Sequence, residues 1–303
     1  MKKEVIKPPR LRQGDTVGVV APAGPFERDP FDRGVATLEA MGFQVKVPEG
    51  IFEQKNYLAG SDEHRAKLLT ELFQDPAVRA IFCVRGGYGS ARILPFLDFK
   101  QIAANSKILV GFSDITILLA AFYHKFGLIT FHGPLVTTLS KSSEKTRDIL
   151  LKAITSDQPV ALTPSEPVVL QPGNVSGPVL GGNLTNICHL IGTPYEPEFA
   201  GAILLLEDRG EAPYRIDRML CHLRLSGRLK DIAGVVVGSF KDCGDVDVIY
   251  DIVKENFTGR DIPILAGFEI GHDTENLTVP IGLEATLDTE SGVLRFDESA
   301  TRP

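Results

Sequence analysis

Several residue types that define whole classes of protein are scarce or missing in this sequence. Its 303 residues include no tryptophan and four cysteines, none of them in a Cys-x-x-Cys pair. No apolar run approaches the ~18 residues that a membrane span requires. No apolar segment follows the basic N-terminal residues, as it would in a signal peptide. We therefore expect a cytoplasmic protein with free thiols and no membrane partner.

Basic residues are fewer than acidic ones. Lysine and arginine number 32 against 39 aspartates and glutamates, which gives a formal charge of −7 and argues against nucleic acid as a partner. No cluster of histidine and cysteine has the spacing of a metal site, and neither the Walker motif nor the dinucleotide fingerprint is complete. We expect the protein to need no metal and no other cofactor.

The first half of the chain alternates apolar strand patterns with helical patterns. This alternation predicts an α/β fold, with a parallel sheet covered by helices on both faces. The expected strands are residues 16–21, 44–47, 77–84, 107–112 and 128–132, and the expected helices are 29–41, 62–74, 90–97 and 114–126.

Residues 140–164 change character, because a polar helix leads there into segments rich in proline and serine. We interpret them as a linker between an N-terminal parallel-sheet α/β sandwich domain, residues 1–139, and a mixed α/β C-terminal domain, residues 165–303. In the second domain we expect strands at 202–207 and 232–240, helices at 183–191, 214–225 and 246–257, and a closing hairpin formed by 278–287 and 292–296.

Ser113 follows an apolar strand and directly precedes a helix, in the string GFSDIT of residues 111–116. A serine there lies at the carboxyl edge of a parallel sheet, where ligands bind. The helix N-terminus offers free N–H groups, so the amide of Asp114 could face an oxyanion beside Ser113. The Gly-x-Ser-x-Gly motif of a nucleophile elbow is not matched, since Ile115 replaces its second glycine. The local string alone favours a simpler role for Ser113, that of a helix N-cap.

A second strand exit carries the string VRGGYGSAR, residues 84–92. Its glycines permit close backbone approach, and adjacent glycine amides such as those of Gly86 and Gly87 could complete an oxyanion hole. A phosphate-binding loop and a plain tight turn are equally compatible with the string.

A nucleophilic serine needs a base, usually histidine, and an acid that orients the base. His132 and His272 are the histidines in strand-exit loops, and either could be structural. Glu207 ends an apolar strand, where a buried carboxylate needs a partner. That partner could be a histidine. Alternatively, Glu207 or Asp208 could pair with Arg209 or Arg215 in an ordinary ion pair.

Seven strings occur in order along nearly the whole chain: GDTVGVVAPAG (14–24), RGGYGSAR (85–92), GFSDIT (111–116), FHGP (131–134), GGNL (181–184), LEDRGEAPYRIDRML (206–220) and GHD (271–273). Together they resemble the LD-carboxypeptidases of peptidase family S66, which also contains microcin C self-immunity hydrolases. GFSD and the ED…YRIDRML string are the specific ones; any of the others alone is weak.

The resemblance implies a serine peptidase with a catalytic triad of Ser113, Glu207 and His272. The family's oxyanion donors fall on the glycine loop, where we favour Gly87, and on the amide of Asp114. His132 is left as a neighbour or packing residue. Arg85, with Gly86, and Arg209 are candidates for binding the terminal carboxylate of a substrate.

The resemblance also implies a substrate, the murein tetrapeptide, from which the family's LD-carboxypeptidases remove the terminal D-alanine during wall recycling in the cytoplasm. The microcin branch instead cleaves a peptide-linked nucleotide and stacks aromatic rings, including tryptophan, on the base. The absence of tryptophan favours the murein branch. Family members are often homodimers, which we expect here too. A non-catalytic nucleotide or peptide binder is the alternative from another class, and the intact triad residues argue against it.

Overall fold

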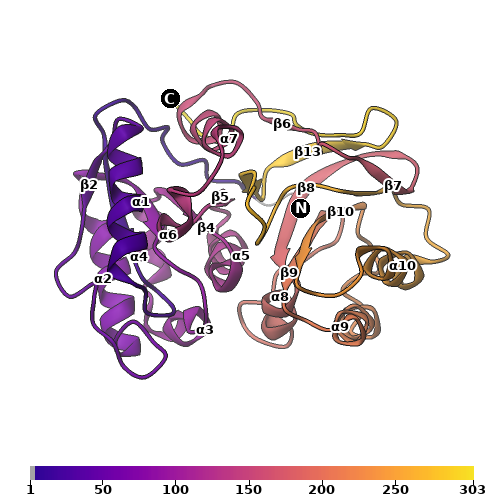
Figure 1. Cartoon of the computed structure of the whole chain (residues 1–303), viewed down its shortest axis with the longest axis horizontal. Helices are drawn as coiled ribbons and strands as arrows, with labels where there is room; N and C mark the ends of the chain where they lie inside the picture. Colours follow the sequence, from indigo (N-terminus) through magenta and orange to yellow (C-terminus); the bar gives the residue numbers. More distant parts are fainter. Residues whose placement is uncertain (1–3) are drawn as a thin grey trace.

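The computed structural model describes residues 4–303 and contains two sheets that lie side by side (Figure 1). The first has six strands in the order β12-β5-β4-β3-β1-β2. Five of them run parallel, and β12 pairs antiparallel with β5 at one edge. These strands are β1 (Thr16–Val20), β2 (Gln44–Lys46), β3 (Val78–Cys83), β4 (Ile108–Gly111), β5 (Thr130–His132) and β12 (Val279–Ile281).

The helices between these strands begin and end where local sequence signals place them. Ser61 accepts the N–H of His64 at 3.1 Å and caps α2, while Gly127, with φ 77°, ends α5. The strand and helix alternation predicted for this half is confirmed. The helices are α1 (Arg28–Ala40), α2 (Asp62–Gln74), α3 (Ser90–Ile93), α4 (Phe99–Ala104), α5 (Thr116–Phe126) and α6 (Val136–Leu139), with 3-10 turns η1 (Leu94–Phe96) and η2 (Ser113–Ile115).

The second sheet has eight strands in the order β6-β14-β13-β8-β9-β10-β11-β7 and is mixed. Its parallel centre, β8-β9-β10-β11, is flanked by antiparallel strands. Its strands are β6 (Ala161–Leu162), β7 (Val168–Gln171), β8 (Asn174–Asn183), β9 (Ile203–Arg209), β10 (Gly234–Lys241), β11 (Ile264–Ala266), β13 (Glu284–Asp288) and β14 (Val293–Phe296). Its helices are α8 (Leu184–Leu190), α9 (Pro213–Leu225) and α10 (Val246–Phe257).

The segment predicted as a linker contains α7 (Glu144–Thr155) and β6, which joins the second sheet. Both sheets contain buried apolar strands. In β9 the run from Ile203 to Leu206 is fully buried, as expected for a parallel strand covered on both faces. The fold is therefore α/β, with a parallel sheet carried by the first half of the chain and a mixed sheet carried by the second.

One predicted element is wrong. Residues 278–287 were expected to form a single strand of the closing hairpin, but the chain turns at Gly282, whose φ is 92°. β12 joins the first sheet, where Val279 pairs with His132, and β13 alone forms the hairpin with β14. The C-terminal half thus contributes the edge strand of the N-terminal sheet.

None of the helices in residues 4–303 is both long and apolar enough to cross a membrane. The four cysteines are free, and Cys83 and Cys243 are buried. Burial raises the pKa of the Cys83 thiol well above its usual range.

Candidate active site

Ser113 lies where β4 passes into α5, and its backbone conformation is unusual. Its φ is +64°, one of three positive values among non-glycine residues in the described chain. L-residues rarely adopt this region, and such outliers are concentrated at functional sites. The residue is not a helix cap: Phe112 and Ile115 hold the N-cap positions of η2 and α5, and neither caps through its side chain. The N-cap alternative is therefore wrong.

The glycine loop lies directly against this serine. A Cβ on Gly86 would come within 2.9 Å of Ser113 Cβ, 3.0 Å of its Oγ and 3.4 Å of the Asp114 nitrogen. Gly87 and Gly89 have φ values of 95° and 134°, so the loop uses backbone shapes that favour glycine. The loop therefore brings its backbone next to the Ser113 hydroxyl and the free end of the helix.

Two buried charged residues hold the loop in place. The Asp114 carboxylate accepts the Ser90 N–H at 2.8 Å, which ties the start of the helix to the end of the loop. Burial raises the pKa of Asp114, although hydrogen bonds with Ser90 and Gly89 act in the opposite direction. Arg65 on α2 is fully buried and donates to the carbonyls of Gly89, at 2.9 Å, and Pro22, and to Asp62. Sequence reasoning missed Arg65, because it lies in the polar first turns of α2, among Asp62, Glu63 and His64.

Glu207 and His272 meet at the end of the second sheet. Glu207 Oε2 lies 2.7 Å from His272 Nδ1, and the carboxylate is fully buried at the end of β9. Two hydrogen bonds fix the loop that carries His272. The His272 N–H donates to Ser239 Oγ at 3.1 Å, and the Gly271 N–H donates to Asn276 Oδ1 at 2.9 Å. A Cβ on Gly271 would stand 2.6 Å from Glu207 Oε2, so this position needs glycine.

The nearby arginines do not pair with Glu207. Arg209 lies 3.5 Å from Asp242, and Arg215 lies 3.3 Å from Glu211. The ion-pair alternative for Glu207 is thus wrong, and its partners are imidazoles. Burial opposes ionisation of Glu207, yet interactions with His132 and His272 outweigh it and lower the pKa of the carboxyl to about 2.

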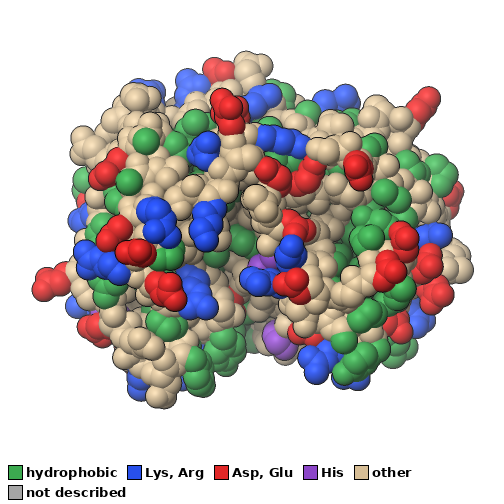
Figure 2. Space-filling view, viewed as in Figure 1, with side chains coloured by type: hydrophobic (Ala, Val, Ile, Leu, Met, Phe, Trp, Pro, Cys, Tyr) green, Lys and Arg blue, Asp and Glu red, His purple; other side chains and the backbone are tan. Residues whose placement is uncertain are grey.

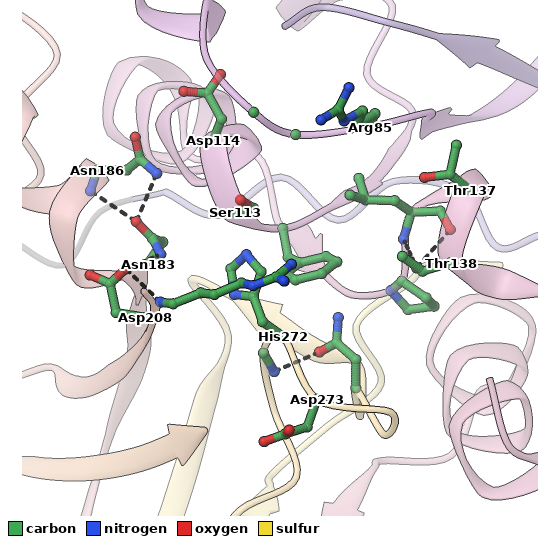
Figure 3. A pocket seen from close by; sticks show the side chains of 18 of the residues that line it. Arg85, Ser113, Asp114, Thr137, Thr138, Asn183, Asn186, Asp208, His272 and Asp273 are labelled. Atoms are coloured by element: carbon green, nitrogen blue, oxygen red, sulfur yellow. Dashed lines mark hydrogen bonds between the residues drawn. The ribbon is translucent and has the colours of Figure 1, made fainter. Parts of the chain in front are cut away.

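Ser113 and His272 line one cavity of about 500 Å³ between the two halves of the molecule. The surface is hollowed there, with charged side chains around the opening (Figure 2). Figure 3 shows Ser113 and Arg85 on one side of this cavity and His272 with Asp273 on the other. Among the other predicted residues, Gly86, Gly87, Asp114 and Arg209 also line it, whereas Glu207 does not. In the described chain no hydrogen bond joins Ser113 to His272.

One wall of the cavity comes from the start of α8. Asn183 donates its backbone N–H to Thr116 Oγ1 on α5 at 3.2 Å and its side-chain amide to Asp208 at 3.0 Å. Asp208 also accepts the hydroxyl of Thr185 at 2.8 Å, which links this wall to the strand that carries Glu207. Figure 3 shows Asn183 beside Asp208. The string GGNL contained Asn183, but nothing in the sequence paired it with Asp208.

His132 lies behind the cavity and does not line it. It is fully buried, and its Nε2 is 3.8 Å from Glu207 Oε1. The Phe112 ring contacts both imidazoles, with centroid separations of 5.6 Å to His132 and 4.8 Å to His272. Glu207 thus lies between two histidines. Within residues 4–303, no group of three or more histidine, cysteine or carboxylate side chains is placed to hold a metal ion.

Comparisons with known proteins identify relatives of this chain. Models of the LD-carboxypeptidase N-terminal and C-terminal domains match residues 17–133 and 176–287. A Bacillus subtilis protein named "Probable murein peptide carboxypeptidase" is 38% identical over 297 residues, covering 93% of this chain and 92% of the relative. The murein tetrapeptide carboxypeptidase of Pseudomonas aeruginosa is 33% identical over 287 residues, covering 90% and 92%.

Solved structures show the same fold. The microcin C7 self-immunity protein MccF, whose curated sequence is from Escherichia coli, has been solved in complex with glutamyl sulfamoyl guanosine. That structure superposes on this chain with a TM-score of 0.91 at 28% identity, covering 98% of this chain and 99% of the other.

Proposed function

Because the chain belongs to the LD-carboxypeptidase family, peptidase family S66, we propose that it is a serine carboxypeptidase that cleaves murein tetrapeptides. The bond cleaved is the L,D-peptide bond to the terminal D-alanine. One observation carries the proposal: the buried Glu207 is hydrogen bonded to His272 across the cavity from Ser113, a serine with positive φ at a helix start.

In this mechanism His272 is the general base. Its Nε2 takes the proton of Ser113 as Oγ attacks the scissile carbonyl, and Glu207 holds the opposite nitrogen and stabilises the imidazolium that forms. The imidazolium then gives its proton to the departing amine of D-alanine as the carbon–nitrogen bond breaks. Water, deprotonated by the same histidine, hydrolyses the acyl-enzyme and restores Ser113.

The oxyanion is bound by backbone amides, which we assign to Gly87 and Asp114. The assignment is supported by the close approach of the neighbouring Gly86 to both Ser113 and the Asp114 nitrogen. Each such donor typically contributes a factor of about 100 to 1000 in rate. The two donors follow different strands. The hydrogen bond from Ser90 N–H to the Asp114 carboxylate therefore also fixes the position of one donor relative to the other.

Ser113 and His272 must come within hydrogen-bonding distance for this chemistry. Catalytic hydrogen bonds are often loose in the free enzyme and tighten when substrate binds. The triad residues belong to different halves of the chain, since Ser113 lies in the proposed domain 1–139 and Glu207 and His272 lie in the proposed domain 165–303. We therefore propose that substrate binding across the cavity completes the triad.

The substrate ends in a carboxylate, and the cavity offers cations for it. Arg85 and Arg209 both line the cavity, and so does Gly86, the residue next to Arg85. Arg85 also donates to the carbonyl of Pro25, which fixes the position of its guanidinium. We assign the terminal carboxylate of D-alanine to Arg85, with Gly86 beside it and Arg209 as the second cation.

The proposed function has a direct chemical test. Purified protein is incubated with murein tetrapeptide and, as matched control, with the same peptide ending in L-alanine. We expect release of D-alanine from the first and little release from the second. Release of L-alanine at an equal rate would contradict the specificity for the L,D bond.

The alternative function is hydrolysis of a microcin C-type peptide-linked nucleotide, which the fold shared with MccF supports. The absence of tryptophan from this chain favours the murein substrate. An aminoacyl sulfamoyl nucleotide offered in the same assay distinguishes the two. Cleavage of that compound without release of D-alanine would favour the microcin branch.

We also propose that the protein acts in the cytoplasm during cell-wall recycling and that it forms a homodimer. The supports are the absence of a membrane-spanning helix in the described residues and the behaviour of the family it resembles. Sedimentation equilibrium tests the dimer, and a monomeric mass at micromolar concentration would contradict it.

A further inference from the structure

His132 is a buried titratable residue that the proposed mechanism does not use. It ends β5 and is fully buried beside Glu207, which is fully buried as well. His132 Nε2 and Glu207 Oε1 face each other at 3.8 Å, and neither atom has a hydrogen-bond partner in the described chain. Buried polar atoms are normally paired, so two unpaired atoms of complementary chemistry at this distance need an explanation.

The position of His132 is set by the sheet rather than by a mobile loop. It pairs with Gly111 of β4 on one side and with Val279 of β12 on the other. A Cβ on Gly182 would come within 3.3 Å of His132 Cδ2, so that glycine makes room for the ring. Backbone and packing therefore aim the imidazole at Glu207.

Few other charges act on this pair. The segments β4 and β12 that flank His132 contain no titratable residue. The next carboxylate along β9, Asp208, is hydrogen bonded to Asn183 and Thr185 and does not contact the imidazole. The titratable groups around Glu207 are thus the imidazoles of His132 and His272, with Asp208 as its chain neighbour.

We propose that His132 is a positioning residue for the triad: its neutral ring donates Nε2–H to Oε1 of Glu207, so that Oε2 stays fixed on His272 Nδ1. The inference rests on the proposed function and deepens it. A carboxylate held by only one oxygen can rotate, whereas donors on both oxygens fix its plane. The contact needs to shorten by about 1 Å to reach hydrogen-bond length. His132 does not line the cavity, so it acts through Glu207 and not on the substrate.

The kinetic test compares three variants in the D-alanine assay. For His132→Leu we expect kcat to fall about 10- to 100-fold, by analogy with the loss of a hydrogen bond that orients a metal-ligating side chain, with KM unchanged. The acid limb of the pH profile should move to higher pH. The reason is that a Glu207 carboxylate without the hydrogen bond from His132 stabilises charged His272 more strongly. His132→Gln keeps an N–H donor and should restore most of kcat. Thr130→Val, on the same buried strand, is the control and should behave as wild type.

Histidine ring ¹⁵N NMR on the full-length protein tests the contact without substrate. We expect His132 to be a single neutral tautomer protonated on Nε2, with a resonance that shifts in Glu207→Gln. A proton on Nδ1, or a resonance indifferent to Glu207→Gln, would overturn the inference even if His132→Leu fails to fold. An active wild type with an unchanged rate and pH profile in His132→Leu would overturn it as well. An inactive wild type with the expected NMR would instead remove the proposed function and leave the contact standing.

Discussion

Gly86→Ala is predicted to inactivate the protein without unfolding it. Gly86 lies outside the left-handed region, so its backbone accepts alanine. The added Cβ, however, would stand 2.9 Å from Ser113 Cβ and 3.0 Å from Ser113 Oγ. Carbon atoms prefer separations of about 3.5–4.0 Å, so the serine or the loop must yield by roughly 0.6–1 Å.

That displacement falls on the reacting atom. A misplacement of about 1 Å typically costs about 100-fold in rate, and loss of one oxyanion donor costs about 100- to 1000-fold. We therefore expect kcat/KM for D-alanine release to fall at least about 100-fold. The unfolding temperature should change little, since the cavity can absorb a small shift.

Gly18→Ala is the matched control. Gly18 also lies outside the left-handed region, and its Cβ would meet Leu72 Cδ2 at 2.7 Å in the core of the first sheet, away from the cavity. It should lower the unfolding temperature while the folded protein keeps its activity. A folded Gly86→Ala protein with the wild-type rate would refute the placement of the glycine loop against the nucleophile.

Three further predictions concern charged residues. Arg65→Met should lower the free energy of unfolding by about 3 kcal/mol, because it removes one partner of a buried ionic network; an unchanged urea midpoint would contradict this. The pKa of Glu207 is lowered, so the stability that its charge contributes is present above the ordinary pKa near 4.5 and is lost as pH falls toward about 2. The difference in unfolding free energy between wild type and Glu207→Gln should therefore shrink as pH falls below about 4.5; a difference that does not change between about pH 4.5 and 2 would argue against the shift. Arg85→Ala should raise KM about 10-fold with kcat held, as expected for one charge-assisted contact to the substrate carboxylate, and an unchanged KM would remove Arg85 from that role.

Much of the first half of the fold could be predicted because its signals are local. The apolar run before Gly111 and the largely apolar run ending at Gly127 define β4 and α5 without knowledge of any distant residue. The same locality placed Ser113 at the carboxyl edge of the sheet. Its positive φ was not predicted, since nothing in the local sequence signals this conformation at a residue other than glycine.

The features that sequence reasoning missed depend on contacts between distant segments. β12 is short and apolar, and nothing local shows that it pairs with His132 of β5 rather than continuing into β13. Arg65 has the sequence context of a solvated helix face, and only the fold brings Gly89 to it. The buried contact between His132 and Glu207 likewise joins the two sheets, so histidine spacing alone could not identify it.

The most direct test of the account compares D-alanine release from murein tetrapeptide by wild type and Ser113→Ala. Both proteins should show the same circular dichroism spectrum and unfolding temperature. We expect release by the wild type and a loss of several orders of magnitude in Ser113→Ala, the usual consequence of removing a triad nucleophile. Equal release by the two folded proteins would contradict the assignment of Ser113 as nucleophile and, with it, the mechanism proposed for this site.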